Sequence, residues 1–231
     1  MANYLVTGTN RGIGLEFVKQ LLARGETVLA TCRDIDKAED LAALQQDNSD
    51  KLELFELDVS DPESRSNFPK RLAGKAIDVF INNAGVYGPR GASFGNVDGQ
   101  DWAEVLMINS IAPVLLTQLL IDNFRQGRGK KLVYISSKMG SIDDNQGGGQ
   151  YIYRTSKAAL NAAVKSLAVD LADAGFSVAV LHPGWVQTDM GGPNALIDTS
   201  TSVEGMLAVI DELNMEKSGQ FLNYDGSTIA W

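Results

Sequence analysis

The side chains best suited to proton chemistry lie in one stretch of the chain, between Ser137 and Lys157. Tyr153 and Lys157 are four residues apart, so on a helix they share one face, about one turn apart. A phenol with a pKa of roughly 10 is a poor proton shuttle near neutrality. A neighbouring ammonium favours the phenolate and moves Tyr153 toward general acid–base catalysis. Ordinary pairs on a helix surface have the same spacing, so this interpretation depends on the rest of the chain.

The composition limits the classes of protein to consider. With 231 residues, of which 44% are hydrophobic and 21% charged, the chain can bury one substantial core. Its net charge of −9 argues against a nucleic-acid partner, and no apolar run approaches the ~20 residues of a membrane helix. We expect no signal peptide, because charge and turn residues appear by Asn10 and Arg11. The one cysteine, Cys32, fits a reducing compartment, so a cytoplasmic enzyme or binding domain is expected.

A glycine-rich loop near the amino terminus is typical of a phosphate site. An apolar run over residues 3–8 predicts a strand, and helical periodicity over 15–24 predicts a helix that stops at Gly25. Backbone N–H groups of such a loop face an anion, and glycines let the backbone approach it. The spacing is G-x3-G-x-G rather than G-x-G-x2-G, and such a loop can also be a simple turn. The flanking strand and helix favour nucleotide binding by Gly8, Asn10, Arg11, Gly12, Ile13 and Gly14.

The end of the second predicted strand, residues 26–33, bears on the choice of cofactor. An acidic residue there selects the free 2′-hydroxyl of a dinucleotide, whereas an arginine suits a 2′-phosphate. This strand ends in Arg33, and Arg11 lies in the glycine loop, so two guanidiniums can converge on one phosphate. Asp34 could instead pair with Arg33 on the surface. We expect NADP(H), with NAD(H) as the less favoured alternative.

Strand and helix patterns alternate along the whole chain. Further strands are predicted at 51–59, 76–82, 130–137, 176–184 and 219–225, and helices at 36–46, 62–72, 98–124, 153–171 and 202–213. No linker, repeat or low-complexity segment interrupts the alternation. The pattern predicts one doubly wound α/β domain over residues 1–231.

Several polar or small residues follow these strands. Asp58 can hydrogen-bond an adenine amino group or cap the helix that begins near Pro62. Asn83-Ala84-Gly85 leaves room for a ligand against the strand end. Asn109 is a polar residue in an apolar stretch, either a buried amide satisfied by backbone or a group that fixes a water. With no second histidine, His182 is assigned a structural role, and no metal site is expected.

In this order and at these separations, the motifs resemble the short-chain dehydrogenase/reductase family over essentially the whole chain. The matching residues are Thr7-Gly8-x3-Gly12-Ile13-Gly14, Asp58, Asn82-Asn83-Ala84-Gly85, Asn109, Ser137, Tyr153-x3-Lys157 and Pro183-Gly184. The Ser-Ser-x-Met-Gly-Ser-Ile loop and the Tyr-Arg-x-Ser-Lys helix start resemble small carbonyl-reductase-like members of the C-factor and sniffer type. The resemblance implies a Rossmann-type sheet of seven parallel strands with helices on both faces, and a nicotinamide cofactor.

The resemblance also implies a role for each matching residue. Tyr153 would donate a proton to a developing alkoxide, and Ser137 would hydrogen-bond the same oxygen. Lys157 would lower the pKa of Tyr153 and hold the nicotinamide ribose, and Asn109 would position a water. The remaining implied cofactor contacts are Arg33, Asp58, Val59, Asn83, Ala84, Gly85, Pro183, Gly184, Val186 and Thr188.

The chain departs from the family pattern in two places. Ser137 and Tyr153 are 16 residues apart, somewhat more than usual, so Gly147-Gly148-Gly149 is expected in a bulged loop. The segment 191–202 is short where many relatives carry a lid, which points to an open substrate site.

An apolar substrate pocket is expected around the catalytic residues. Its walls would be Tyr87, Met139, Trp185 and Met190. No cation is placed to hold a carboxylate, because Arg154 points about 100° away from Tyr153 on a helix. Neutral, hydrophobic or aromatic aldehydes and ketones are therefore the expected substrates.

NADPH-dependent carbonyl reduction is the leading functional hypothesis. A nucleotide-sugar epimerase or dehydratase would keep Tyr-x3-Lys but usually has a larger carboxy-terminal substrate region. A signalling or regulatory protein that binds NADP(H) without turnover is the other alternative. An alanine-rich helix face at Ala158, Ala159, Ala162 and Ala163 suits a homodimer or homotetramer, or packing within the subunit.

Overall fold

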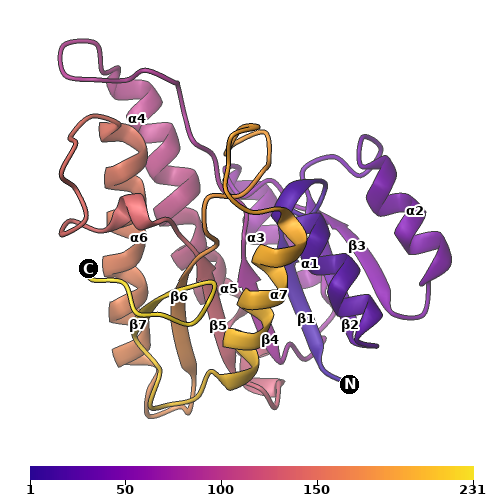
Figure 1. The fold of residues 1–231 in the computed structure, drawn as a ribbon. Helices are drawn as coiled ribbons and strands as arrows, with labels where there is room; N and C mark the ends of the chain where they lie inside the picture. Colours follow the sequence, from indigo (N-terminus) through magenta and orange to yellow (C-terminus); the bar gives the residue numbers. More distant parts are fainter.

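The computed structural model describes residues 1–231 and contains one sheet of seven parallel strands (Figure 1). The strand order is β3-β2-β1-β4-β5-β6-β7. The strands are β1 (Asn3–Thr7), β2 (Thr27–Cys32), β3 (Leu52–Glu56), β4 (Val79–Asn82), β5 (Lys131–Ile135), β6 (Ser177–His182) and β7 (Gln220–Asn223). The helices are α1 (Gly12–Ala23), α2 (Glu39–Asp47), α3 (Pro62–Arg71), α4 (Gly99–Leu106), α5 (Ala112–Gln126), α6 (Tyr151–Asp170) and α7 (Thr199–Glu212).

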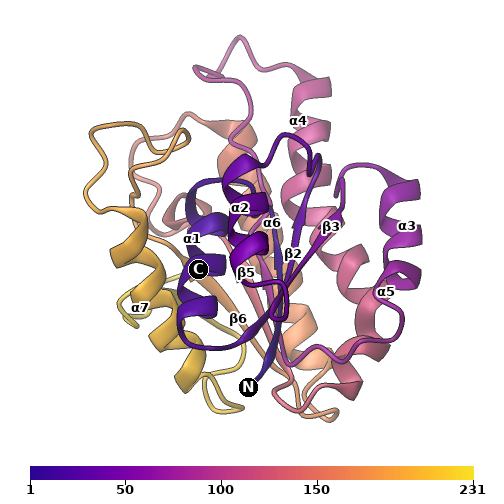
Figure 2. The ribbon, with the colours of Figure 1, turned by 90° about the vertical axis from the view of Figure 1, so that its right-hand side faces the viewer.

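Helices cover both faces of the sheet, which confirms the predicted doubly wound fold. One hydrophobic core joins one face of the sheet to α1, α2 and α7, and a second joins the other face to α3, α5 and α6. Figure 2 shows α1 and α7 on one side of the strands and α3 and α5 on the other. The strands are buried on both faces, as near-continuous apolar segments such as Val178–Leu181 require.

The strand order places a crevice at one end of the sheet. Chain connections run outward in opposite directions from β1 and β4, which are neighbours, so the loops after these two strands diverge. Parallel strands bring all their carboxyl ends to one edge. In Figure 1 this edge lies at the top, opposite the N terminus. The glycine loop, Asn83–Gly85, Ser137 and Pro183–Gly184 therefore meet there.

The long apolar stretch predicted over 98–124 is not one regular helix. A π-helical turn, Met107–Ile111, separates α4 from α5. The amide of Ala112 donates to the carbonyl of Met107, five residues earlier. Pro113 has no N–H to give the carbonyl of Asn109, four residues back, so a regular α-helical bond is unavailable at that point.

Residues Gly99–Gln126 are long and apolar enough to cross a membrane by length and composition alone. Half of the most apolar window within this segment is buried inside the protein. Residues of α5 such as Leu116, Leu120 and Phe124 belong to the core beneath the sheet, as expected for a core helix.

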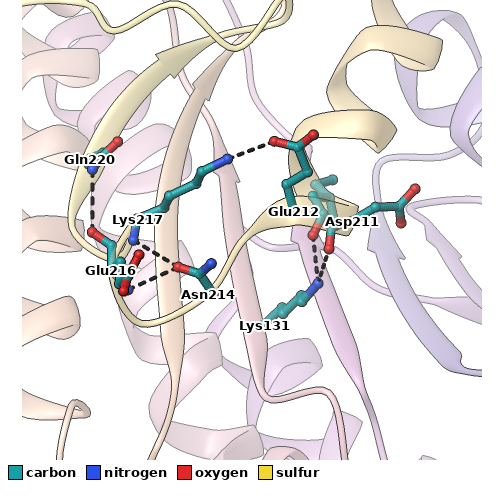
Figure 3. A network of polar contacts seen from close by, with 8 residues as sticks. Lys131, Asp211, Glu212, Asn214, Glu216, Lys217 and Gln220 are labelled. Carbon is teal, nitrogen blue, oxygen red and sulfur yellow. Dashed lines mark hydrogen bonds and ion pairs between the residues drawn. The ribbon is translucent and has the colours of Figure 1, made fainter.

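A polar network fixes the carboxyl end of α7 beneath the sheet (Figure 3). The Lys131 ammonium, at the start of β5, donates to the carbonyls of Ile210 and Asp211 at 2.8 and 2.9 Å. In the loop that follows, Lys217 pairs with Glu212 at 2.7 Å and Asn214 accepts from two backbone amides. Lys131 thus gives the Asp211 carbonyl a partner at the helix end and adds a second bond to the Ile210 carbonyl, which also accepts from the Leu213 amide.

This network predicts that replacing Lys131 by methionine lowers the free energy of unfolding more than replacing Lys217 by methionine. Lys131→Met should lower the free energy of unfolding by about 1–2 kcal/mol, because it removes two charge-assisted bonds at a helix end. Lys217→Met should change it by less than about 0.5 kcal/mol, since its ion pair with Glu212 is exposed. Urea unfolding of both variants checks this, and equal losses would contradict the role given to Lys131.

Candidate active site

Helix α6 and the end of β5 bring three predicted catalytic side chains together. Tyr153 and Lys157 lie one turn apart on the buried face of α6 and are 7% and 5% exposed. Ser137 follows β5, and its hydroxyl accepts from the amide of Met139 at 3.2 Å. The Lys157 ammonium donates to the carbonyl of Ile135 at 3.0 Å and lies 5.8 Å from the centre of the Tyr153 ring. The arrangement has a proton donor, a second hydroxyl and a cation at one place.

The Tyr153 phenol is shielded by two side chains from different loops. The Tyr87 ring stacks on it with centroids 4.5 Å apart and an interplanar angle of 27°. The Tyr153 hydroxyl points at the sulfur of Met190, 4.0 Å away. Tyr87 and Met190 were both predicted to line the substrate pocket, and the structure places both against the phenol.

Burial is the largest influence on the pKa values of Tyr153 and Lys157. It raises the pKa of Tyr153 to about 12; a hydrogen bond from Ser137 opposes the rise and the nearby Tyr87 adds to it. Burial likewise lowers the pKa of Lys157 to about 8. The sequence analysis expected Lys157 to lower the Tyr153 pKa, and the structure differs because loss of hydration outweighs the other effects on the phenol. Tyr153 is therefore fully protonated near neutral pH.

Asn109 is buried within the π-helical turn and makes three hydrogen bonds through its amide. Its oxygen accepts from the amide of Val86 at 2.9 Å. Its nitrogen donates to the carbonyl of Val86 at 2.7 Å and to the Ser156 hydroxyl at 3.0 Å. The side chain thereby ties the loop after β4 to α6. A water-holding role for Asn109 stays a prediction.

A cleft of about 550 Å³ opens between the glycine loop and the ends of β1, β2 and β4. Its lining includes the predicted residues Gly8, Asn10, Arg11, Gly12, Ile13, Gly14, Arg33, Asp58, Val59, Asn83, Ala84, Gly85 and Thr188. Pro183, Gly184 and Val186 do not line it, and Val186 is buried. The cleft also has walls that motif matching missed, among them Cys32, Gln187 and Asp189.

The glycine loop has the form that a phosphate group needs. Helix α1 begins at Gly12 with no side-chain cap, so its first-turn amides are open toward the cleft. Gly8 has a φ of +70°, and a Cβ there would lie 2.9 Å from Ala84 Cα. A Cβ at Gly14 would lie 2.1 Å from the Gly8 carbonyl oxygen. Only glycines allow this close packing, and the open amides fit a dinucleotide pyrophosphate.

The two arginines predicted to hold a 2′-phosphate both line the cleft but differ in their partners. Arg33 makes no ion pair, and Asp34 pairs with Lys37 at 2.6 Å rather than with Arg33 as considered above. Arg11 pairs with Asp189 of the loop after β6 at 2.8 Å, with both side chains largely exposed. Asp58 accepts from the amide and hydroxyl of Ser60, which together with Arg33 hold the pKa of its carboxyl below its ordinary value despite its partial burial. The Pro62 helix is capped instead by Asp61.

Known proteins match this site and fold. The sequence profile described as short chain dehydrogenase matches residues 2–196. The chain belongs to the short-chain dehydrogenase/reductase family. It is 48% identical to the C-signal of Myxococcus xanthus over 155 residues, which cover 67% of this chain and 93% of that protein.

Solved structures extend the likeness over the entire dehydrogenase. The carbonyl reductase Sniffer of D. melanogaster is 35% identical with a TM-score of 0.95, and the match covers 100% of both chains. The NADPH-bound carbonyl reductase from chicken fatty liver is 38% identical with a TM-score of 0.92, covering 100% of this chain and 99% of that one. The predicted family, its oxidoreductase class and the seven-stranded Rossmann-type fold are confirmed.

Other predicted walls of the dehydrogenase site are more dispersed. Trp185 lines a different cavity from Met190, and its indole donates to the carbonyl of Gly191. Arg154 turns to the carbonyl of Met139 at 3.3 Å, away from Tyr153 as expected. The sequence analysis missed Arg90, which donates to the carbonyls of Asp189 and Met190 and lies 5.8 Å above the Tyr87 ring. Its place in an irregular loop gave no pattern that could have pointed to it.

The lowered pKa of Lys157 predicts how stability depends on pH. Its pKa is about 8 in the folded dehydrogenase and 10.5 ordinarily. Between these values the unfolded chain holds a proton that the folded chain has lost, so stability rises with pH in this window. Relative to Lys157→Met, which has no such group, the native protein should gain about 2.5 kcal/mol between pH 7 and pH 10. Urea unfolding of both proteins checks this, and a pH-independent difference would contradict the burial of a charge.

Proposed function

We propose that this dehydrogenase reduces aldehydes and ketones to alcohols with NADPH. The observation that carries the proposal is the buried Tyr153 phenol, one helical turn from the buried Lys157 and close to a glycine-walled cleft that Met190 also lines. The carbonyl reductases with similar structures support the same reaction class. When bound, the reduced nicotinamide supplies the hydride, and the protein supplies the proton and the polar surroundings.

Tyr153 is the proposed general acid. Its raised pKa keeps the proton on the phenol near neutral pH, ready for an oxygen that gains negative charge. The Ser137 hydroxyl would donate to the same oxygen and stabilise its charge. Lys157 would contribute positive charge beside the phenol and hold the nicotinamide ribose. Shielding of the phenol by Tyr87 and Met190 strengthens these interactions, because charges interact more strongly away from water.

The proposed cofactor site runs from the glycine loop to the ends of β2 and β4. The open amides of α1 would hold the pyrophosphate, and Asp58 would face the adenine. Arg33 would hold the 2′-phosphate, since it has no competing carboxylate partner. Arg11 would also bind the 2′-phosphate, in place of Asp189. Its ion pair with Asp189 is exposed and therefore weak.

The proposed substrates are neutral and hydrophobic. Tyr87 and Met190, the groups against the phenol, are aromatic and thioether side chains. The Arg90 guanidinium, 5.8 Å from the centre of the Tyr87 ring, already donates to two backbone carbonyls of the loop after β6. A keto acid would therefore have to compete for this arginine, whereas an aromatic aldehyde would pack directly on the rings.

Removing the Tyr153 hydroxyl tests the reaction. Tyr153→Phe should reduce turnover of NADPH and aromatic aldehydes by at least ~100-fold, the low end for a positioned acid, while leaving NADPH affinity nearly unchanged. Tyr151→Phe on the same helix is the matched control, because Tyr151 is 36% exposed and should keep full activity. Turnover that survives in Tyr153→Phe would contradict the role of Tyr153 as general acid. A native protein without turnover would favour cofactor binding without catalysis.

Cofactor choice is tested by binding rather than activity. Arg33→Gln should weaken NADPH by roughly 10–100-fold, the effect of losing a bond between charged groups, and should leave NADH within about threefold. Arg11→Gln should act in the same direction, and Arg125→Gln, whose exposed partner is Asp122, serves as the control. Fluorescence titration gives both affinities. Equal binding of NADPH and NADH by the native protein would rule out the arginine assignment.

We also propose a homodimer that forms through α5 and α6. Three apolar side chains recur every fourth residue from the end of the π-helical turn into α5: Ile111, Leu115 and Leu119, which are 44%, 36% and 39% exposed. Together with the partly exposed alanines of α6, they give a self-complementary face that suits a two-fold axis.

Leu119→Glu should convert that dimer to monomer, because it places a charge on the apolar stripe. Gln118→Glu, an exposed neighbour pointing about 100° away, should leave the dimer intact. Light scattering at micromolar concentration measures both masses. A native protein that is already monomeric would exclude this interface.

A further inference from the structure

Two side chains cover the buried phenol of α6, and the first of them, Tyr87, has a well-anchored backbone. On one side of it in the loop after β4, the backbone of Val86 exchanges two hydrogen bonds with the Asn109 amide. On the other side, Gly88 packs so closely on α4 that a Cβ there would lie 2.8 Å from Val105 Cγ2. The loop is therefore fixed just before and just after the residue whose ring stacks on the phenol.

The second cover, Met190, lies in a single helical turn of the loop after β6. The amide of Gly192 donates to the carbonyl of Thr188, four residues back, at 2.8 Å. The carbonyls of Asp189 and Met190 accept no backbone amide, as expected where a helical turn ends. Their hydrogen-bond donor has to come from another part of the chain.

Arg90 connects the two covers. Its Nη2 donates to the carbonyls of Asp189 and Met190 at 3.1 and 3.2 Å. Its guanidinium carbon also lies 5.8 Å from the centre of the Tyr87 ring, within the range of a cation–π interaction. A guanidinium suits both contacts, because it is planar, stacks on aromatic rings and has several N–H donors.

We propose that Arg90 is a positioning residue, which holds Tyr87 and Met190 together over the Tyr153 phenol and so keeps water away from it. Arg90 makes no hydrogen bond to the phenol and does not line the cofactor cleft, so it acts through the two covers. Its role in catalysis rests on the proposed carbonyl reduction, whereas its effect on the phenol can be measured without turnover.

Arg90→Met separates this role from a direct effect of charge. A cation near a phenol favours the phenolate, so the loss of a direct effect would raise the pKa of Tyr153. Loosening the covers admits water and should instead lower that pKa from about 12 by at least about 1, toward its ordinary value of 10.0. Tyr87 and Lys157, the titratable groups beside the phenol, are unchanged in this variant.

The ¹³C resonance of the Tyr153 Cζ reports this pKa. In Arg90→Met the phenol should be half-ionised by about pH 11, where the native phenol still holds most of its protons. Arg128→Met is the matched control, because Arg128 is also exposed but precedes β5 at the opposite edge of the sheet. It should titrate like the native protein. Thermal melts establish that both variants are folded.

Kinetics connects the covers to the reaction. With benzaldehyde as the probe, Arg90→Met should raise KM by roughly 3–10-fold, because the aromatic wall is no longer held in place, and should change kcat by less. NADPH affinity should stay within about twofold, since Arg90 does not line the cofactor cleft. A native protein without turnover would overturn the proposed function and leave the titration of the phenol to decide the role of Arg90.

Several results would each overturn this role. They are an unchanged or raised pKa of Tyr153 in folded Arg90→Met, an equal fall in Arg128→Met, and an unchanged KM for benzaldehyde. An NADPH affinity that weakens as much as KM rises would overturn it as well, because Arg90 would then act on the cofactor site.

Discussion

The removal of one phenol from water is the constraint on which the candidate site depends. Tyr153 is enclosed by Tyr87, Met190, Ser137 and the face of α6, and these groups come from four separate segments. The enclosure keeps the proton on the phenol and leaves the Lys157 ammonium less hydrated than in water. Dehydration makes each group more responsive to a charge that develops beside it, which is the property a proton donor requires.

The strand order of the sheet and hydrogen bonds between loops bring these segments together. Parallel strands end at one edge, and the reversal of strand order at β1 and β4 opens the cleft there. Asn109 joins the loop after β4 to α6, and Arg90 joins that same loop to the loop after β6. Hydrogen bonds between loops therefore hold the site residues together beyond the ends of the strands. The pair of Arg11 and Asp189 adds a weaker link between the phosphate loop and the loop after β6.

Local patterns in the sequence were enough to predict the architecture and to place Tyr153 and Lys157 on one face of a helix. Apolar runs, glycine stops and the four-residue spacing of Tyr153 and Lys157 are local signals, and each led to the correct element. The π-helical turn was missed because helical periodicity continues through it. Pro113, which has no backbone N–H for an α-helical hydrogen bond, was the one local signal of the irregularity. The raised pKa of Tyr153 was missed because burial depends on Tyr87 and Met190, which approach from distant loops. Trp185 lines a different cavity from Met190, because chain proximity to the catalytic residues does not fix the direction of a side chain.

The protonation of Tyr153 can be measured directly. In protein labelled with ¹³C at the tyrosine Cζ position, the Tyr153 resonance is assigned by its loss in Tyr153→Phe and followed from pH 6 to pH 11. The structure predicts that this phenol keeps its proton through pH 10, because burial raises its pKa to about 12. A pKa near 8 would contradict the account, since it would mean that the charge of Lys157, rather than the loss of water, governs the proton on Tyr153.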